Sequence, residues 1–382
     1  MLLNTKKRGV IYNNDGNDVY VSYDNCPGAY DISHLDGSTI NAENFLKPRS
    51  YGLENTQIGT VMYCDGVFGS YHHESVGITD TRVRCWARAL KEYTGKDSLT
   101  TMVDFVHSKD KDIIWSLRMN DVHDAAYQEN ELDPWKQANM DVLMCRKADN
   151  AYMSYGGGYW SAVDYGNPKV RQFVYDNFWD TLTRYDIDGI ELDWTRWPIA
   201  FKEVTRGLDV YPENLERMNN LIRMIRDLTE QISIERGKPI LVSIYVPDSI
   251  GLCKSIGLDV ETWLEEDLVD IVSIGCHNGI CQTWEDAVKE YNDYDVQVYA
   301  ALDALYYVDS KDDYYVDKNE AALAYAAGAD GIYTYNYFDI NHARFDTLGS
   351  PETVGSVDPN YKSNLKLYKG GLARDTMKFV TR

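Results

Sequence analysis

Hydrophobic positions along the chain follow two alternating spacings. Short apolar runs rich in β-branched and aromatic residues are separated by longer runs with apolar side chains every three or four positions. The short runs predict strands at Gly9–Tyr12, Ile58–Tyr63, Ile113–Met119, Gly189–Trp194, Ile240–Val246, Ile271–Gly275, Val296–Ala301 and Gly331–Tyr335. Strands that alternate with helices in this number are typical of the (β/α)8 TIM barrel of the α/β class.

The longer runs predict the helices that separate these strands. Pro168 suits the first helical turn after Asn167 as the N-cap, and Gly237 and Gly328 stand where two helices should end. The predicted helices are Arg82–Tyr93, Leu99–His107, Pro168–Tyr185, Pro212–Arg236, Val260–Glu266, Trp284–Asn292 and Lys318–Ala327.

Two connections are too long to be simple turns: Ser22–Asn55 after the first strand and Asp121–Asn167 after the third. Loops that follow barrel strands lie at the C-terminal face, where they shape substrate pockets. We expect residues 1–382 to form a single catalytic barrel, with Asp358–Arg382 as a C-terminal extension packed against it.

The fourth predicted strand carries two carboxyl groups where a buried strand should be apolar. Side chains alternate between faces, so Glu191 and Asp193 share one face, opposite Ile190 and Leu192. A buried carboxylate is costly unless it is paired, hydrogen-bonded or protonated. The pair therefore indicates an active site, and the alternative for Glu191 is a structural ion pair with an arginine.

The same alternation places polar side chains inside the barrel and apolar ones against the helices. The residues predicted to point inward are Ser116, Arg118, Asn120, Ser243, Tyr245, Ser273, Gly275, Tyr299, Ala301 and Asp303. Their outward neighbours, such as Val242 and Ile274, are apolar. A polar lumen near the mouth suits a barrel that cleaves polysaccharides.

Glycoside cleavage needs two carboxyl groups on either side of the scissile bond. Asp193 stands at the mouth end of its strand, Glu191 lies one pleat deeper, and Asp303 ends the seventh strand, nearly opposite. We predict Asp193 as the nucleophile or base, with Asp303 or Glu191 as the acid.

Further polar and aromatic residues gather at the predicted strand ends. Arg118 is expected to neutralise Glu191 and to tune the pKa of Asp193, and His123 to bind a sugar hydroxyl or act as an acid. The predicted substrate-binding residues are Asn14, Arg118, Asn120, Asp121, His123, Arg196, Trp197, Tyr245, His277 and Tyr335.

Net charge and aromatic content indicate which classes of molecule the protein binds. The net charge of −22 argues against nucleic acid or an anionic membrane surface, whereas 30 Tyr and 9 Trp suit stacking on sugar rings. No stretch approaches the apolar length of a membrane span. The N-terminus shows no apolar signal region, so the protein is cytoplasmic or exported with its signal removed. Oligomeric state stays open.

Cysteine and histidine spacing predicts neither a metal nor a cofactor. The seven cysteines include no Cys-x-x-Cys pair, and the histidines form no His-Glu-x-x-His pattern. We expect the cysteines to be free, buried thiols.

The segment Asp188–Trp194 (DGIELDW) resembles the fourth-strand Asp-Gly-x-Asp-x-Asp-Trp-Glu segment of the chitinase family. The final Glu of that segment is the family's acid, and Thr195 stands there in this chain. The sequence looks closer to bacterial glycosyl hydrolase-like barrels, with the resemblance extending over Arg8–Asp339. It implies a carbohydrate substrate, and barrel glycosidases with a nucleophilic Asp at this strand end favour that role for Asp193.

Three functions remain after these observations. A glycoside hydrolase fits the paired carboxyl groups, and a carbohydrate-binding barrel without catalysis fits the loss of Glu at position 195. A lyase, aldolase or metal-dependent hydrolase would need a strand-end lysine or clustered histidines, which the predicted strand ends lack.

Overall fold

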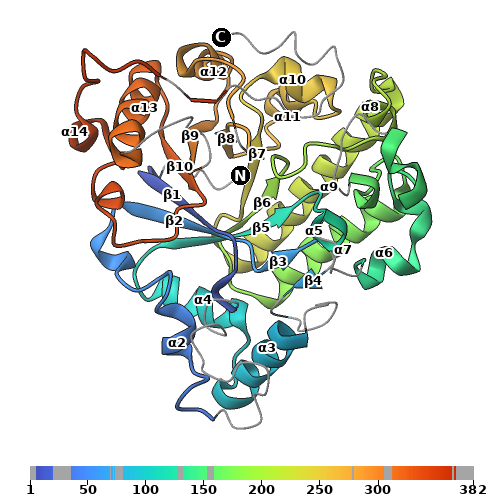
Figure 1. The fold of residues 1–382 in the computed structure, drawn as a ribbon, viewed down its shortest axis with the longest axis horizontal. Helices are drawn as coiled ribbons and strands as arrows, with labels where there is room; N and C mark the ends of the chain where they lie inside the picture. Colours follow the sequence, from blue (N-terminus) through green and yellow to red (C-terminus); the bar gives the residue numbers. More distant parts are fainter. Residues whose placement is uncertain are drawn as a thin grey trace.

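A closed barrel of parallel strands forms the centre of the computed structural model (Figure 1). The structure describes residues 6–19, 36–68, 70–71, 73, 81–126, 132–152, 159–277, 279–304, 312–363 and 365–366. Around the barrel the strands follow the order β1-β10-β9-β8-β7-β6-β5-β2. They are β1 Val10–Asn14, β2 Ile58–Tyr63, β5 Asp112–Arg118, β6 Gly189–Asp193, β7 Leu241–Val246, β8 Ile271–Ile274, β9 Gln297–Asp303 and β10 Gly331–Tyr335. The predicted (β/α)8 barrel is confirmed.

Helices surround the barrel and cover the outer face of its strands (Figure 1). Asn167 accepts a hydrogen bond from the backbone N–H of Lys169 and caps α7, while Gly237 (φ 67°) and Gly328 (φ 105°) end α9 and α13 as predicted. The longer helices are α3 Thr81–Thr94, α4 Ser98–His107, α7 Pro168–Arg184, α9 Pro212–Arg236, α10 Ile250–Ser255, α11 Val260–Glu265, α12 Trp284–Lys289 and α13 Asp313–Ala327.

The long connections after β1 and β5 contain short elements of their own. The short helices are α2 Ala42–Leu46, α5 His123–Ala126, α6 Pro134–Ala138, α8 Lys202–Thr205 and α14 Pro351–Val354. A small hairpin pairs β3 Gly66–Val67 with β4 Ser70–Tyr71. The 3-10 helices are Leu53–Asn55, Met140–Val142, Lys147–Tyr152, Tyr159–Ser161 and Ala343–Asp346.

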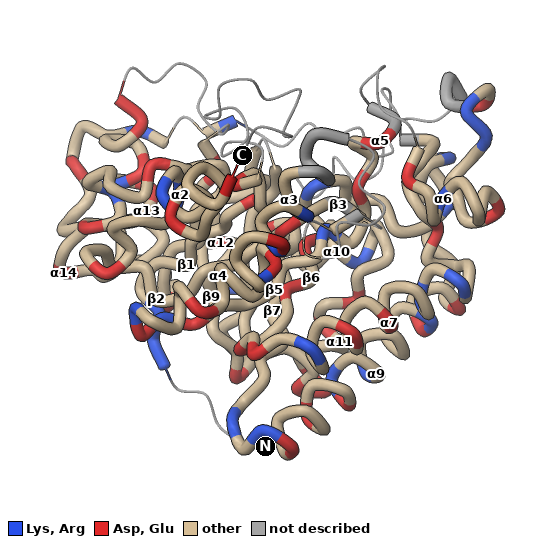
Figure 2. Tube along the Cα trace, turned by 90° about the horizontal axis from the view of Figure 1, so that it is seen from below, with Lys and Arg blue, Asp and Glu red and all other residues tan. Residues whose placement is uncertain are grey.

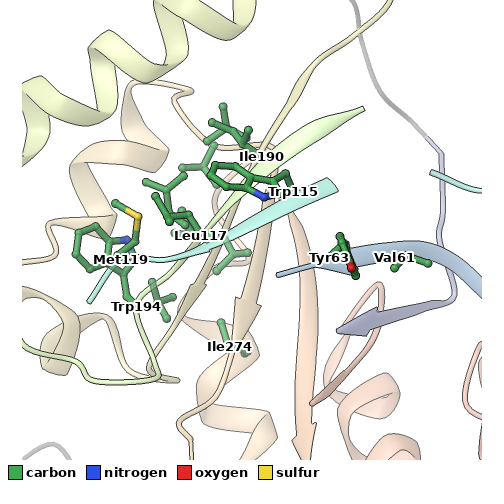
Figure 3. Close-up of a cluster of buried hydrophobic side chains, with 14 of the residues drawn as sticks. Val61, Tyr63, Trp115, Leu117, Met119, Ile190, Trp194 and Ile274 are labelled. Carbon is green, nitrogen blue, oxygen red and sulfur yellow. The ribbon is translucent and has the colours of Figure 1, made fainter. Parts of the chain in front are cut away.

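Side-chain alternation on the strands separates two hydrophobic layers. Figure 3 shows the outer layer, in which Trp115 and Leu117 of β5 lie beside Ile190 of β6 and Trp194. The lumen contains Ile11, Met62, Ile114, Leu241, Tyr245, Ile271, Tyr299, Ala301, Tyr333 and Tyr335. Tyr245, Tyr299 and Ala301, which were predicted to point inward, belong to this lumen layer, and their predicted outward neighbours Val242 and Ile274 belong to the outer layer. Asn120 lies beyond the end of β5, and its amide bonds to loop backbone instead.

The described part of the C-terminal extension contacts the side of the barrel formed by α12 and α13. Tyr315 of α13 donates a hydrogen bond to Asp358, and Tyr361 donates one to Glu320. The backbone N–H of Ile280 donates to the carbonyl of Lys366. The rest of the predicted extension, residues 367–382, lies outside the described residues.

Acidic residues are spread along the outer helices, with lysine and arginine between them (Figure 2). The charge of −22 is thus distributed over the surface rather than collected at one element. Among the described residues, no helix combines the length and the apolar character needed to cross a membrane.

Candidate active site

Strand β6 brings Glu191 into the barrel lumen, where no lysine, arginine or histidine among the described residues forms an ion pair with it. The side chain is fully buried, and Oε2 accepts a hydrogen bond of 3.2 Å from the Tyr333 hydroxyl, which itself accepts one of 2.8 Å from Asn13 Nδ2. Burial, and then the neighbouring Asp193, raise the pKa of Glu191 to about 8. Glu191 is therefore protonated at neutral pH.

The arginine expected to neutralise Glu191 serves a different carboxyl group. Arg118 stands opposite Asp193 in the β5–β6 register, whereas Ser116 stands opposite Glu191. Arg118 Nη1 donates to Asp121 Oδ2 at 3.3 Å. The alternative of a structural Glu191–arginine ion pair is wrong for the described part of the chain.

Asp193 ends β6 at the mouth of the barrel, with its two oxygens in different situations. Oδ1 accepts hydrogen bonds of 2.9 Å from both the backbone N–H and the hydroxyl of Thr195. Oδ2 makes no hydrogen bond within the described residues. Burial raises the pKa of Asp193, although the Thr195 bonds, Arg118 and Arg196 oppose the shift. One oxygen is thus fixed by hydrogen bonds, and the other has none among the described residues.

A second polar network crosses the mouth beside Asp193. Arg196 donates from Nη1 to His277 Nε2 at 2.6 Å and from Nη2 to His123 Nε2 at 3.2 Å. The Nδ1 atoms contact carboxylates, at 2.8 Å for His277 with Asp303 and 2.7 Å for His123 with Asp121. Because a guanidinium only donates, each Nε2 must accept, and each Nδ1 carries the proton.

Both carboxylates of this network are held as acceptors. Burial alone would raise the pKa of Asp121, but the His123 ring and Arg118 lower it below its ordinary value. Asp303 also accepts a 3.0 Å hydrogen bond from Asn336 Nδ2. Asn336 follows β10 with a φ of 64°, a left-handed conformation that asparagine tolerates better than most residues.

Aromatic rings line the network at two depths. Trp197 lies under the Arg196 guanidinium, 5.2 Å from its ring centre, and meets the His123 ring edge to face at 4.7 Å. Tyr245 and Tyr335 lie deeper, with ring centres 5.5 Å apart, and are buried in the lumen. Trp197 is half-buried, whereas the two tyrosines are buried.

Two predicted substrate-binding residues are occupied by the protein backbone. The Asn120 amide donates to the carbonyls of Val163 and Ile199 and accepts from the N–H of Val163, which ties down the loop after β5. Asn14 Oδ1 accepts from the N–H of Gly16 in the turn after β1. We therefore assign neither Asn14 nor Asn120 to substrate binding.

Sequence reasoning missed several residues that complete the site. Tyr333 has the same strand parity as Tyr335, which was the available signal for its inward position. Asn13 reaches Tyr333 and Asn336 reaches Asp303 through contacts that join segments far apart in the sequence. Thr195, noted only for the missing acid, fixes Asp193.

Comparison with protein-family models matches most of the barrel sequence to one family. The model of glycosyl hydrolases family 18 matches residues 104–336, more than half of the chain. No protein of curated function matches.

Solved structures give only distant similarity. A family 18 N-acetylglucosaminidase from Paenibacillus barengoltzii is 10% identical (TM-score 0.45), with 80% of this chain and 95% of that chain covered. A multi-modular cell-surface chitinase from Paenibacillus sp. str. FPU-7 is 10% identical (TM-score 0.46), with 87% and 42% covered. An alpha-L-fucosidase from Paenibacillus thiaminolyticus is 14% identical (TM-score 0.46), with 86% and 46% covered. This chain spans less than half of the last two proteins.

Proposed function

The chain belongs to family 18 of the glycosyl hydrolases, and from that membership we propose which of its residues cleave the glycosidic bond. It is a glycoside hydrolase, and its substrate is a carbohydrate. Since Thr195 stands where the resembling chitinase segment has its acid, the proton donor has to be another group.

We propose Asp193 as the carboxyl group that meets the reacting carbon or its water. The observation that carries this assignment is the unequal use of its oxygens, with Oδ1 fixed by Thr195 and Oδ2 without a hydrogen bond in the described residues. Arg118 and Arg196 favour its charged form, which a nucleophile or base requires.

Glu191 is the better proton source of the two predicted acids. Its pKa of about 8 keeps the proton on the carboxyl group at neutral pH, and ionisation of Asp193 strengthens that hold. Asp303 instead accepts hydrogen bonds from His277 and Asn336, so it has no proton to give at those atoms. Asp303 is a positioning residue that acts through His277.

Arg196 and Trp197 form the proposed sugar-binding wall. Arg196 is held between two histidine acceptors, so its orientation is set before the substrate arrives. Trp197 offers an apolar ring face for stacking, with Arg196 behind it. We also infer from the net charge of −22 that nucleic acids and anionic membranes are not partners.

A product screen of matched variants tests the assignment of Asp193. Wild type, Asp193→Asn and the control Asp227→Asn, on the exposed face of α9, are incubated with a polysaccharide panel and assayed for new reducing ends. We expect product from wild type and the control, and a loss of ~10²–10⁴-fold or more in Asp193→Asn with an unchanged circular dichroism spectrum.

Two outcomes would contradict the proposal. A fully active Asp193→Asn enzyme would remove Asp193 from the chemistry. Sugar binding by wild type and Asp193→Asn, with product from neither on any substrate of the panel, would favour the carbohydrate-binding barrel without catalysis.

A further inference from the structure

Outside the active site, three metal-binding side chains converge behind the loop that carries His277. Asp248 follows β7, and Cys276 and Cys281 follow β8; all three are buried. Cys276 Sγ lies 3.6 Å from Cys281 Sγ and 3.6 Å from Asp248 Oδ1. One ligand atom from each residue lies within 4.8 Å of the others. We propose that these residues form a structural site for a thiophilic divalent cation of the Zn²⁺ type.

The two separations from Cys276 match the edges of a tetrahedral zinc site. With Zn–S bonds of about 2.3 Å and Zn–O bonds of about 2.0 Å, tetrahedral angles place two sulfurs about 3.8 Å apart, and a sulfur and an oxygen about 3.5 Å apart. The 3.6 Å contacts from Cys276 fall between these values. The Cys281 sulfur and the Asp248 oxygen lie within 4.8 Å of each other, and a cation would draw these two atoms together by side-chain rotation.

The Asp248 carboxylate is oriented as ligands of structural metals are. The backbone N–H of Cys281 donates to Oδ1 at 3.0 Å and to Oδ2 at 2.9 Å, and the N–H of Gln282 donates to Oδ2 at 3.0 Å. Such hydrogen bonds fix a ligating carboxylate and raise its metal affinity. A carboxylate accepts at about four positions, two on each oxygen, so Oδ2 is fully used, while Oδ1 accepts one backbone N–H and keeps a lone pair on the side of Cys276.

The electrostatic setting favours a cation. Among the described residues, no lysine, arginine or histidine forms an ion pair with Asp248, and the two thiols beside it are buried away from water. A divalent ion would offset the charge of the carboxylate and of the thiolates that binding creates. Cys253, whose Sγ lies 3.3 Å from the carbonyl of Pro247, adds a further buried thiol nearby.

The site has a place in the proposed function because Cys276 precedes His277 in the chain. A metal that ties Cys276 and Cys281 to Asp248 would hold both ends of the segment that positions His277 against Asp303 and Arg196. The metal is structural, so its binding can be measured even if the proposed roles of Asp193 and Glu191 fail.

Metal binding by the full chain tests the proposal. Wild type, Cys281→Ser, Asp248→Asn and the control Cys145→Ser are stripped with a chelator, dialysed against Zn²⁺ and analysed by elemental mass spectrometry. We expect one tightly held Zn²⁺ in wild type and the control, and affinity at least ~100-fold weaker in the two ligand variants. Cys145 is a suitable control because it is only partly buried and lies outside the cluster.

Substitution of Co²⁺ keeps the test valid if a ligand variant fails to fold. Wild type loaded with Co²⁺ should show the thiolate-to-cobalt charge-transfer band of a site with two sulfur ligands. Wild type without tight Zn²⁺ or without that band, equal binding by Cys281→Ser, or a Cys276–Cys281 disulfide mapped by mass spectrometry in untreated protein would each overturn the proposal.

Discussion

The carboxyl group just before β6 and the one in the middle of the strand lie in opposite electrostatic environments. Asp188, just before the strand, accepts hydrogen bonds from the N–H of Ile113 and from His107 Nε2, at 2.9 and 2.8 Å, and pairs with Lys238 at 3.0 Å. Burial raises the pKa of Asp188, but these partners lower it overall. Glu191, three residues on, has no cationic partner in the described chain and a pKa of about 8.

The difference separates a charge-compensated position from the position that we propose to be reactive. At the bottom of the barrel, charge is compensated and the carboxylate holds strands and a helix together. Toward the mouth, compensation is incomplete, and the energy that ionisation would cost keeps a proton on Glu191. Barrel enzymes place their chemistry at the C-terminal face of the sheet. In this chain the carboxyl pKa is lowered at Asp188 and raised at Glu191, so the direction of the shift reverses toward that face.

The largest expected effect on activity comes from removing the carboxyl proton of Glu191. In Glu191→Gln the neutral amide keeps the volume and loses the acid, so kcat should fall by ~10²–10⁴-fold, with a smaller change in KM. Steady-state kinetics on the substrate found by the product screen measure both constants. An unchanged kcat would make Glu191 a structural group like Asp188, and the comparison would fail.

Asp303 separates the effect of hydrogen-bond partners from that of position. Like Asp188 it accepts hydrogen bonds from neighbouring side chains, but it lies at the mouth of the barrel. In Asp303→Asn the new amide nitrogen can donate to His277 Nδ1, and the ring proton would then move to Nε2. The protonated Nε2 could no longer accept the hydrogen bond from Arg196 Nη1. We expect a loss of about 10–100-fold in kcat/KM with unchanged thermal stability. Nitrogen-15 NMR of His277 should report the tautomer change, which a merely structural role would leave unmoved.

The sequence predicted which face of a strand a side chain lies on better than it predicted which side chains on that face contact each other. Alternation starting from Glu191 and Asp193 identified the inward residues because parity is a local property. Arg118 and Glu191 do share a face, but the register of β5 and β6 sets Arg118 level with Asp193 instead. Register depends on the whole barrel, so the expected ion pair could not be checked from the residues alone.

Contacts between distant segments explain the other differences. The Tyr333 hydroxyl reaches Glu191 from across the lumen, and His277 meets Asp303 because β8 and β9 are neighbours. Asn120 was expected at the substrate because amides bind sugars, but the loop after β5 presents backbone groups that use its amide first. The type of a polar residue therefore indicates which hydrogen bonds it can make, and the fold determines which partner lies close enough to make them.

Stability as a function of pH tests the Glu191 half of the comparison. A carboxyl group whose pKa rises on folding stabilises the protein below the unfolded value, near 4.3, and that stability is lost as pH rises through about 8. Glu191→Gln removes this loss, so it should be more stable than wild type by about 1–3 kcal/mol at pH 8. Urea unfolding at pH 4 and pH 8 should show the gap only at the higher pH.

Asp188→Asn should give the opposite pH trend and the smallest effect on activity. A lowered pKa stabilises the folded state above the unfolded value, near 3.9, and that contribution is lost as pH falls through the folded pKa. The variant should therefore lose about 1–2 kcal/mol at pH 7, since hydrogen bonds to a charged acceptor are weakened, and approach wild type below pH 4. Its kcat should stay within about twofold of wild type. The same urea series measures both variants, and parallel pH trends for Glu191→Gln and Asp188→Asn would show that the two carboxyl groups lie in similar electrostatic environments.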